Sequence, residues 1–316
     1  MKQSLAAASC GVVLAISIAA CSKRDEQATV PAEPAAPATA ATSIEPIPAG
    51  ATVKPFTIGS FQAAALKDGD LSVANDTKTI AINAPKPEIE ALLKGNDVAT
   101  DELHLSVQPL IVKTTDKVLL FDTGAGDLFG PTVGKFDESL AAAGIDAAGV
   151  TDIFISHGHG DHVGGLFANN ALAFPNATIH IQAAEWNSLQ QNQQMASLVP
   201  LMTPKVVAFE PGADLVEGVK AVDIKGHTPG HSGYLITSGD QSLLYIGDTM
   251  HHSVISVQRP DWTIAYDGDA PTAQASRKQV IADAAANGQR IYAVHFPFPG
   301  LGKFAQQGEH FVWVAE

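Results

Sequence analysis

Short apolar runs alternate with polar turns and helical stretches along the chain after about residue 50. Residues 107–112 and 118–121 are rich in Val, Leu and Ile, and the polar segment KTTDK between them predicts a β-hairpin. Residues 136–143 predict a helix that ends before Gly144, because glycine is favoured just past a helix C-terminus. Further strands are predicted at residues 153–156, 219–224, 234–237, 243–246 and 291–294, and a late helix at residues 272–287 is followed by Gly288.

This order of elements predicts the fold class. Hairpins give antiparallel strand pairs, whereas a helix between two strands gives a parallel pair. A chain that contains both is therefore expected to form mixed sheets in a layered α/β fold. No internal repeat and no second linker interrupt the pattern, so residues 51–316 are expected to form one domain with one large core.

The first 21 residues have the form of a secretory signal, with Lys2 followed by an apolar run from Leu5 to Ala20. The run is too short for a comfortable membrane span. It ends in the sequence IAAC, which resembles the bacterial lipobox, so we expect a lipoprotein-type signal peptide at residues 1–21 with Cys21 as the lipidation site. The alternative is an ordinary cleaved signal with a chance cysteine. Ser22 follows, and by resemblance to bacterial sorting rules this favours an exported, periplasmic protein at the outer membrane, with membrane contact only through its lipid anchor.

Residues 22–50 are rich in Ala, Pro, Thr and Glu and contain few large apolar side chains that a core could bury. This composition predicts a disordered Ala/Pro-rich linker, partly extended by its prolines. It would act either as a spacer from a membrane or simply as a poorly ordered terminus.

Composition also limits the chemistry of the domain. Cys10 would leave with the signal and Cys21 would be acylated, so no thiol ligand and no disulfide are expected after residue 21. Any metal site must then use His, Asp and Glu. The chain carries 19 Lys and Arg against 33 Asp and Glu, a net charge of −14. This acidic balance argues against nucleic acid as a partner.

The segment SHGHGDHVGG at residues 156–165 concentrates metal-binding side chains directly after a predicted strand. Alternate residues of an extended loop point to the same side, so the rings of His157 and His159 are expected to point toward the same site. The glycines between them let the loop turn sharply and admit a substrate. Asp161 and His162 complete the cluster within six positions.

Three more residues of the same chemical type follow later predicted strands: His227 in KGHTPGHSG, Asp248 in YIGDTMHH and His295 in AVHFPFPG. Side chains just past strand ends can converge on one rim of an α/β fold. Neutral imidazole and carboxylate groups bind borderline divalent ions such as zinc. Because one zinc takes about four ligands, the set predicts two divalent metal ions, with Zn²⁺ as the expected metal, that share a carboxylate and a hydroxide.

The remaining histidines lie in ordinary contexts, and we assign no role to His104, His180 and His310. His231 and Ser232 are expected to shape a loop, because the strand, sharp turn and helix that surround a serine nucleophile are not predicted there.

These motifs resemble the metallo-β-lactamase superfamily, whose pattern is His-x-His-x-Asp-His followed by a histidine, a bridging aspartate and a final histidine. The segments HGHGDH at 157–162 and FDTG at 121–124 match, as do the three later residues. The resemblance covers residues 55–316 and implies a four-layer αβ/βα sandwich with two mixed β-sheets. It implies that one metal is held by His157, His159 and His227, that the other is held by Asp161, His162 and His295, and that Asp248 bridges them.

By the same resemblance, Asp122 is expected to orient ligands or loops from behind the metal site. The alternative is a simple turn residue after a strand. The segments DLFGPTVGKF, GDTMHH, TIAYDGDA and HFPFPGLG are similar to the methyl parathion hydrolase group and its lactonase and arylesterase relatives. Dimerisation is common in that group, so the resemblance leaves a homodimer as one alternative. No sequence pattern in this chain indicates a dimer interface.

Two departures from related enzymes narrow the expected substrates. The β-lactamases of the superfamily usually lack the clustered aspartate and carry a cysteine where this chain has Asp248, so a cephalosporin is not expected as the main substrate. Acyl-homoserine lactonases often carry a tyrosine three residues after the bridging aspartate, where this chain has His251. This difference weakens the assignment of a signal lactone without excluding it.

We therefore expect a metal-dependent hydrolase of hydrophobic esters, lactones or phosphotriesters, in which a hydroxide shared by two metals attacks the substrate. Asp161 or Asp248 is expected to take the proton. Aromatic groups near the rim would select hydrophobic substrates. The candidates for the substrate pocket are Phe129, Trp186, Phe296 and Phe298, with His251 or His252 in contact with substrate or leaving group.

Two alternatives remain open from the sequence. The same ligands can hold iron and serve a glyoxalase II-like thioesterase or other chemistry of this fold. A glutathione-thioester enzyme should carry basic residues near its pocket, and no such cluster is evident. The second alternative is a metal-binding lipoprotein without catalysis, although pure binding does not need an open two-metal site.

Overall fold

The computed structural model describes residues 44–316, so the predicted signal peptide, Cys21 and most of the predicted linker lie outside the described residues. The described part begins before residue 51. Ile47 is buried in a core cluster, and Lys113 Nζ donates a hydrogen bond to the backbone oxygen of Glu45. The last residues of the predicted linker, 44–50, therefore pack against the domain, although they form no helix or strand.

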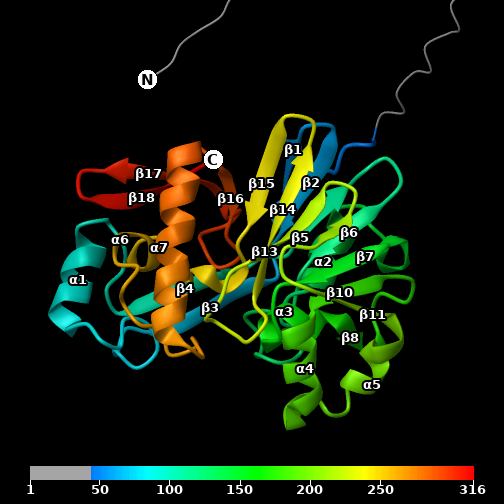
Figure 1. The fold of residues 1–316 in the computed structure, drawn as a ribbon, viewed down its shortest axis with the longest axis horizontal. Coiled ribbons are helices and arrows are strands. Elements are labelled where there is room, and N and C mark those ends of the chain that lie inside the picture. The colour runs from blue at the N-terminus through cyan, green and yellow to red at the C-terminus, as the bar shows by residue number, and fades with distance from the viewer. Residues whose placement is uncertain (1–43) are drawn as a thin grey trace, which may run out of the picture. The chain divides into compact units, whose positions relative to one another are not determined.

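The first of two large sheets combines antiparallel and parallel pairs (Figure 1). Its order is β1-β2-β5-β6-β7-β10-β11, with antiparallel pairing from β1 to β6 and parallel pairing from β6 to β11. The strands are β1 (Val53–Ile58), β2 (Phe61–Leu66), β5 (Leu110–Lys113), β6 (Val118–Phe121), β7 (Asp152–Ile155), β10 (Thr178–Gln182) and β11 (Val206–Phe209).

The second sheet has the order β12-β13-β14-β15-β16-β17-β18 and contains one parallel pair, β15 with β16. It is therefore also mixed. Its strands are β12 (Asp214–Val216), β13 (Val219–Asp223), β14 (Ser232–Ser238), β15 (Gln241–Tyr245), β16 (Arg290–Tyr292), β17 (Leu301–Gln307) and β18 (His310–Ala315).

Two small hairpins, seven α-helices and five short 3₁₀ helices complete the described part of the chain. The hairpins are formed by β3 (Gly69–Ala74) with β4 (Glu102–Val107) and by β8 (Phe167–Ala168) with β9 (Ala171–Leu172). The helices are α1 (Lys86–Lys94), α2 (Phe136–Ala142), α3 (Gly160–Val163), α4 (Ala183–Gln191), α5 (Val199–Met202), α6 (Ile255–Gln258) and α7 (Ala270–Asn287). None of the described helices is both long enough and apolar enough to cross a membrane.

Alternation along the strands sorts side chains between the layers. In β5, Leu110 and Val112 lie in the core cluster between the two sheets, whereas Ile111 lies in the cluster on the outer face. Tyr234 and Tyr245 of the second sheet belong to the same central cluster. Successive side chains of a strand point to opposite faces of the sheet. Because both faces of this sheet are buried, its strands have continuous apolar runs.

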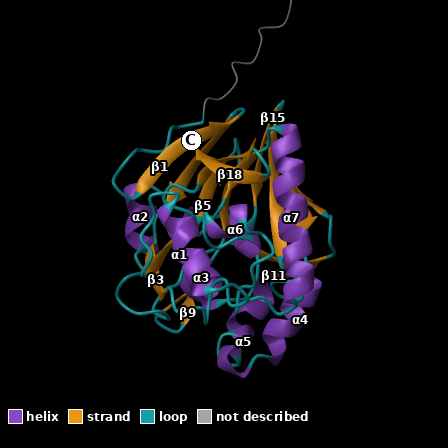
Figure 2. Ribbon diagram, turned by 90° about the vertical axis from the view of Figure 1, so that its left-hand side faces the viewer, coloured by secondary structure: helices purple, strands orange, loops and turns teal. Residues whose placement is uncertain are grey.

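Helices cover the outer face of each sheet. Phe136 of α2 and Leu189 of α4 pack in the outer cluster of the first sheet, and Ile281 of α7 packs in the outer cluster of the second. In Figure 2 the strands lie between α2 on one side and α7 on the other. The predicted four-layer αβ/βα sandwich with two mixed sheets is confirmed.

The predicted elements occur, with ends shifted by one to three residues in most cases. The hairpin at KTTDK is the β5–β6 pair, but Val107 belongs to β4 instead. Helix α7 begins two residues before the predicted start, because the Asp269 side chain accepts a hydrogen bond from the Thr272 amide and Pro271 lies in the first turn.

Candidate metal centre

Each candidate ligand lies in a loop, a turn or a short helix that follows a strand. His157 follows β7, and His162 lies in the four-residue helix α3 that comes next. His227 follows β13, and Asp248 lies in a 3₁₀ turn (Gly247–Thr249) after β15. His295 follows β16. The predicted convergence of strand ends therefore places these side chains together.

The candidate ligands form two adjacent groups. Within each group the potential ligand atoms lie within 4.8 Å of one another. One group contains His157, His159, His227 and Asp248, and the other contains Asp161, His162 and His295. Asp248 also reaches the second group, because its Oδ1 lies 3.1 Å from His162 Nε2 and 3.0 Å from His295 Nε2. The grouping matches the two sets that the family resemblance implies, with Asp248 between them.

The donor atoms fit divalent cations. His227 Nε2 lies 3.2 Å from His157 Nε2 and 3.1 Å from His159 Nδ1. Three imidazole nitrogens that face one another cannot all be satisfied by hydrogen bonds, because each neutral ring has one lone pair and one N–H. His162 Nε2 and Asp248 Oδ1 are buried and have no hydrogen-bond partner among the described residues. Metal ions would satisfy both kinds of atom.

The opposite ring nitrogens of the ligands are held by hydrogen bonds. His162 Nδ1 lies 2.7 Å from Asp122 Oδ2, and His295 Nδ1 lies 2.8 Å from the Ser106 backbone oxygen. His227 Nδ1 lies 3.0 Å from Asp267 Oδ1. A partner on Nδ1 leaves Nε2 free to face the centre, and such partners fix the tautomer of a metal-binding histidine.

Asp122 lies behind His162, as the sequence predicted. Its carboxylate also accepts hydrogen bonds from the Ser156 amide (2.7 Å), the Ser156 hydroxyl (2.6 Å) and the Tyr245 hydroxyl (2.7 Å). Its backbone φ is 55°, an uncommon conformation for a residue other than glycine. This residue is therefore more than a turn residue, because it joins β6, β7 and β15 behind the centre.

Two buried residues that the sequence did not single out support the group that contains His157, His159 and His227. Asp267 accepts from His227 with one oxygen and pairs with Arg277 Nη2 at 2.9 Å with the other. Arg277 is fully buried and also donates to the backbone oxygens of Thr249, Pro260 and Trp262. One arginine thus holds both ends of the 249–267 segment. An arginine inside a helix carries no local sequence signal of this role.

His231 and Ser232 shape their loop, as expected. His231 Nδ1 lies 2.9 Å from the Ile224 backbone oxygen, and its Nε2 accepts from the Asp248 amide at 2.9 Å. His180 is structural, since its Nε2 lies 2.9 Å from Asp152 within the first sheet. His104 is on the surface.

Electrostatics make the centre attractive to cations. Burial acts to lower the pKa of His227, but hydrogen bonds with Asp248 and Asp267 outweigh it and raise that pKa to about 9. The pKa of His162 is likewise raised well above its usual value, because Asp248, Asp161 and Asp122 outweigh its burial. Protons and metal ions therefore compete for these nitrogens, and metal affinity should fall as the pH falls.

A cavity of about 440 Å³ opens directly over both groups. Its surface is more apolar than polar, and four of the candidate ligands, His159, Asp161, Asp248 and His295, contribute to its lining. The lining residues are Leu71, Ser72, Val73, Leu105, Phe129, His159, Gly160, Asp161, Gln194, Asp248, His251, Tyr266 and His295.

The predicted pocket residues divide between the cavity and the core. Phe129 and His251 line the cavity. Trp186 instead packs against the outer core of the first sheet, and Phe296 is fully buried in the outer core of the second, with its ring 5.0 Å from that of Trp313. These two predictions are wrong, because both side chains pack in outer layers and neither lines the cavity.

Phe298 and His252 also lie away from the cavity lining. Phe298 packs against the core between the sheets. His252 Nδ1 accepts hydrogen bonds from the amides of Val254 and Ile255, each at 3.2 Å, just before helix α6. Of the two adjacent histidines, His251 is therefore the one that lines the cavity.

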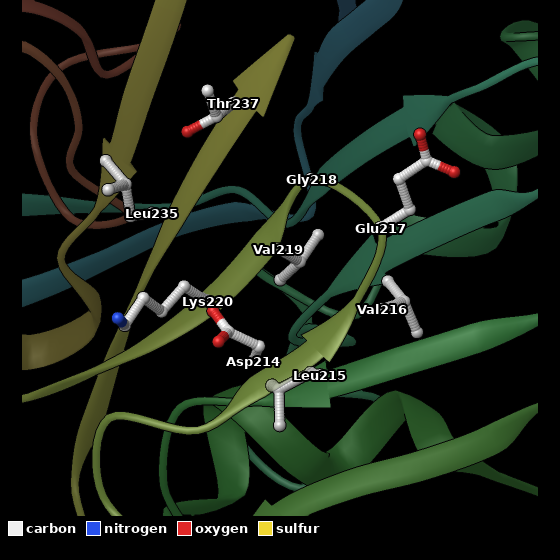
Figure 3. Close-up of a pocket in the computed structure, with 9 residues that line it drawn as sticks. All are labelled: Asp214, Leu215, Val216, Glu217, Gly218, Val219, Lys220, Leu235 and Thr237. Atoms are coloured by element: carbon white, nitrogen blue, oxygen red, sulfur yellow. The ribbon is translucent and has the colours of Figure 1, made fainter.

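Another hollow, of about 540 Å³, lies along β12, β13 and β14 in the second sheet (Figure 3). Its labelled side chains include Asp214, Glu217 and Lys220, together with apolar residues. It shares no lining residue with the cavity over the candidate centre, so it is a separate hollow.

Comparison with known proteins agrees with this geometry. A family model described as the metallo-beta-lactamase superfamily matches residues 105–295. The chain is 28% identical over 179 residues to a probable metallo-hydrolase of Mycobacterium tuberculosis, which covers 45% of this chain and 56% of the relative. It is 30% identical over 155 residues to an N-acyl homoserine lactonase of a Bacillus species, covering 42% and 59%. The chain thus spans little more than half the length of these curated relatives.

Two solved structures are similar over most of their length. AidC, a dizinc quorum-quenching lactonase in complex with the product N-hexanoyl-L-homoserine, has a TM-score of 0.78 and 30% identity, covering 84% of this chain and 97% of AidC. The hydrolase AbOPH of the beta-lactamase superfamily has a TM-score of 0.77 and 26% identity, covering 85% and 99%.

Proposed function

The chain belongs to the metallo-beta-lactamase superfamily, and we propose that within it the protein is a dinuclear zinc hydrolase of hydrophobic esters, lactones or phosphotriesters. One observation carries the proposal: two adjacent groups of His and Asp side chains form the base of an apolar cavity. A site that only stored metal would not need this opening, because closed sites suit structural metals.

The ligands divide between two ions in this proposal. His157, His159 and His227 would hold one, Asp161, His162 and His295 would hold the other, and Asp248 would contact both. When bound, the two ions supply Lewis-acid activation of water and of the substrate oxygen near neutral pH.

The chain's own residues then bind, orient and move protons. The carboxylates of Asp161 and Asp248 both line the cavity, and either would accept the proton released by the attacking water. The Asp161 side chain is the more accessible, at 12% against 4% exposed. His251 Nε2 lies 3.2 Å from Asp248 Oδ2, at a position to contact substrate or leaving group.

The cavity supports a hydrophobic substrate. Leu71 and Val73 of β3, Leu105 of β4 and Phe129 supply apolar surface opposite the ligands. The two similar lactonases favour a lactone among the three proposed classes. None of the described lining residues is Lys or Arg, so the anionic part of a glutathione thioester would lack a partner.

The N-terminal pattern supports a separate proposal on location. Lipidation of Cys21 would tether the enzyme in the periplasm through residues 22–43. This location is independent of the chemistry at the centre.

The chemistry is tested with the zinc-loaded protein on a matched panel. The panel holds an aryl ester, an aryl lactone, an acyl-homoserine lactone, a dimethyl phosphotriester, a glutathione thioester and a cephalosporin. We expect the highest kcat/KM among the first four. His159→Ala and Asp248→Ala should each lower it by at least about 100-fold, since each removes a metal ligand.

The matched control is His104→Ala, which removes an exposed histidine outside the centre and should leave kcat/KM unchanged. A preference for the thioester would replace the proposed substrate class. A zinc-loaded protein that is inert on the whole panel would contradict the proposal of a hydrolase.

A further inference from the structure

Glu185, in the first turn of helix α4, makes no contact with the cavity but joins two loops of the metal centre. The residue is 3% exposed. Its Oε1 accepts a hydrogen bond from the Gly158 amide at 2.8 Å, and its Oε2 accepts from the Gly230 amide at 2.8 Å and the Thr228 hydroxyl at 2.7 Å. Three donors converge on one buried carboxylate.

The two loops carry the histidines of one metal group. Gly158 lies between His157 and His159, and Thr228 directly follows His227. His227 lies 70 positions after His157 in the sequence, yet the three histidines share one group of potential ligand atoms. The Glu185 carboxylate therefore fixes the spacing of the two loops directly behind that group.

Helix α4 packs closely on both loops, and a glycine lies at each contact point. A Cβ atom on Gly158 would lie 2.6 Å from Leu189 Cδ2 and 3.1 Å from Glu185 Oε1. A Cβ atom on Gly230 would lie 2.3 Å from the Glu185 amide nitrogen. The hydrogen bonds of Glu185 thus operate across a tightly packed interface, where the loops cannot shift without losing them.

The second metal group is held by different residues. Asp122 supports His162, and the Ser106 backbone oxygen supports His295. Gln108 adds to this support, because its Nε2 donates to the backbone oxygens of Ala293 and Phe296 on either side of His295. The structure records no hydrogen bond between Glu185 and these residues. A change at Glu185 should therefore act on one metal group and spare the other.

We propose that Glu185 is a positioning residue that sets the metal affinity of the three-histidine group, independently of the second group. The inference rests on the two-metal centre of the proposed function. Partners that orient metal ligands typically change metal affinity by about 10–100-fold when they are removed. The expected effect is selective loss of one of the two ions.

The test compares zinc release from wild-type protein, Glu185→Gln and Glu185→Ala. Each protein is loaded with zinc, and release to an excess of a chromogenic chelator is followed by absorbance. We expect two phases in each protein. In the variants one phase should be faster by about 10–100-fold, while the other keeps the wild-type rate, and dialysis should leave one zinc per chain.

Glu185→Gln keeps the size of the side chain, so it separates positioning from packing if the alanine variant folds poorly. Thr228→Val removes one of the three donors from the opposite side and should accelerate the same phase by a smaller factor. Gln190→Ala, on the exposed side of the same helix, is the matched control and should release zinc as wild type does.

Unchanged release in both glutamate variants would overturn the inference, and so would equal acceleration of both phases, which is what general destabilisation produces. Release involves no substrate. A wild-type protein that holds two zinc ions but hydrolyses nothing would therefore contradict the proposed function while the release comparison still decides the role of Glu185.

Discussion

At the residue scale, the centre depends on buried partners that determine which atom of each ligand faces inward. Asp122, Asp267 and the Ser106 backbone oxygen each occupy the Nδ1 side of a different histidine. The candidate ligands were predictable, because they occur in a contiguous motif and at three positions after strand ends. Asp267 was not, because only the folded chain brings it 3.0 Å from a histidine 40 positions earlier.

The aromatic residues show the same limit. Phe129 and Phe296 both lie close to motifs of the site in the sequence, but Phe129 is 46% exposed and Phe296 is fully buried. A ring beside a motif is equally suited to a cavity wall or to a core, so its place depends on which layer covers it. The sequence alone therefore cannot separate the two.

Phe129→Ala should weaken the binding of hydrophobic substrates. The partly exposed ring of Phe129 lines the cavity. The alanine variant would therefore lose its contact with the substrate in both the ground state and the transition state. We expect KM to rise by about 10-fold with little change in kcat, since about 1.4 kcal/mol of uniform binding is removed. Steady-state kinetics on a long-chain and a short-chain lactone measure this, and the effect should be larger for the long chain.

Trp186→Ala is the comparison variant, because Trp186 packs on the outer core and not on the cavity. It should lower the free energy of unfolding and leave KM unchanged. The reverse pattern, with KM raised only by the Trp186 change, would place the substrate on the other side of the first sheet.

At the scale of elements, strands with large apolar side chains were predictable and alanine-rich ones were not. Strand β2 has the sequence FQAAAL, and alanine has low intrinsic preference for strands. It forms because β1 and β5 pair with it on both sides and because Ala63, Ala64 and Ala65 are fully buried. Strand β17 is similar, since its polar end (Gln306 and Gln307) is held by pairing with β18.

Asp152 links neighbouring strands of the first sheet and should make their stability depend on pH. It accepts from Lys117 Nζ at 2.8 Å and lies 2.9 Å from His180 Nε2 of β10. Burial acts to raise its pKa, but the hydrogen bonds from His180 and Lys117 outweigh it, so the pKa lies well below the usual value. A lowered folded-state pKa gives stability that is complete above the unfolded-state pKa of about 3.9 and is lost as the pH falls below it.

We therefore expect Asp152→Asn to lower the free energy of unfolding by on the order of 1 kcal/mol at pH 7. The difference from wild type should shrink as the pH falls below about 4. Urea unfolding across this range measures it, with the exposed Asp137→Asn as control. If the difference in the free energy of unfolding between wild type and Asp152→Asn grew as the pH fell, the predicted pH dependence of the Asp152 contribution would have the wrong sign.

At the scale of the whole molecule, the sequence predicted the layers but placed the start of the domain a few residues late. The layers follow from strand periods and from the alternation of hairpins and crossover helices. The start does not, because Ile47 is one apolar residue in a Pro- and Ala-rich stretch, and only its burial against the first sheet reveals its role. Isolated apolar residues in a linker carry no periodic signal.

Metal removal should destabilise the whole sandwich. The centre joins loops from both sheets, so ions bound there favour the folded state over the unfolded state. At a free zinc concentration about 1,000-fold above Kd the gain is about 4 kcal/mol, and each kcal/mol shifts the melting temperature of a chain this large by about 2–4 °C. Calorimetry of chelator-treated protein should show a lower melting temperature that two equivalents of zinc restore.

Asp248→Ala, which lacks the carboxylate between the two groups, should recover much less on addition of zinc. If the wild-type melting temperature did not respond to either chelator or zinc, the candidate centre would not bind metal in the folded state.

Arg277 holds both ends of the 249–267 segment, and this affects which parts of the candidate site can be substituted. Because Thr249 and Asp267 are both anchored from helix α7, the stretch between them has fixed ends beside Asp248 and His227. That stretch also contributes His251 and Tyr266 to the cavity. We therefore expect that substitutions at the cavity-lining positions of this stretch alter substrate preference, while its anchored ends keep the candidate metal centre in place.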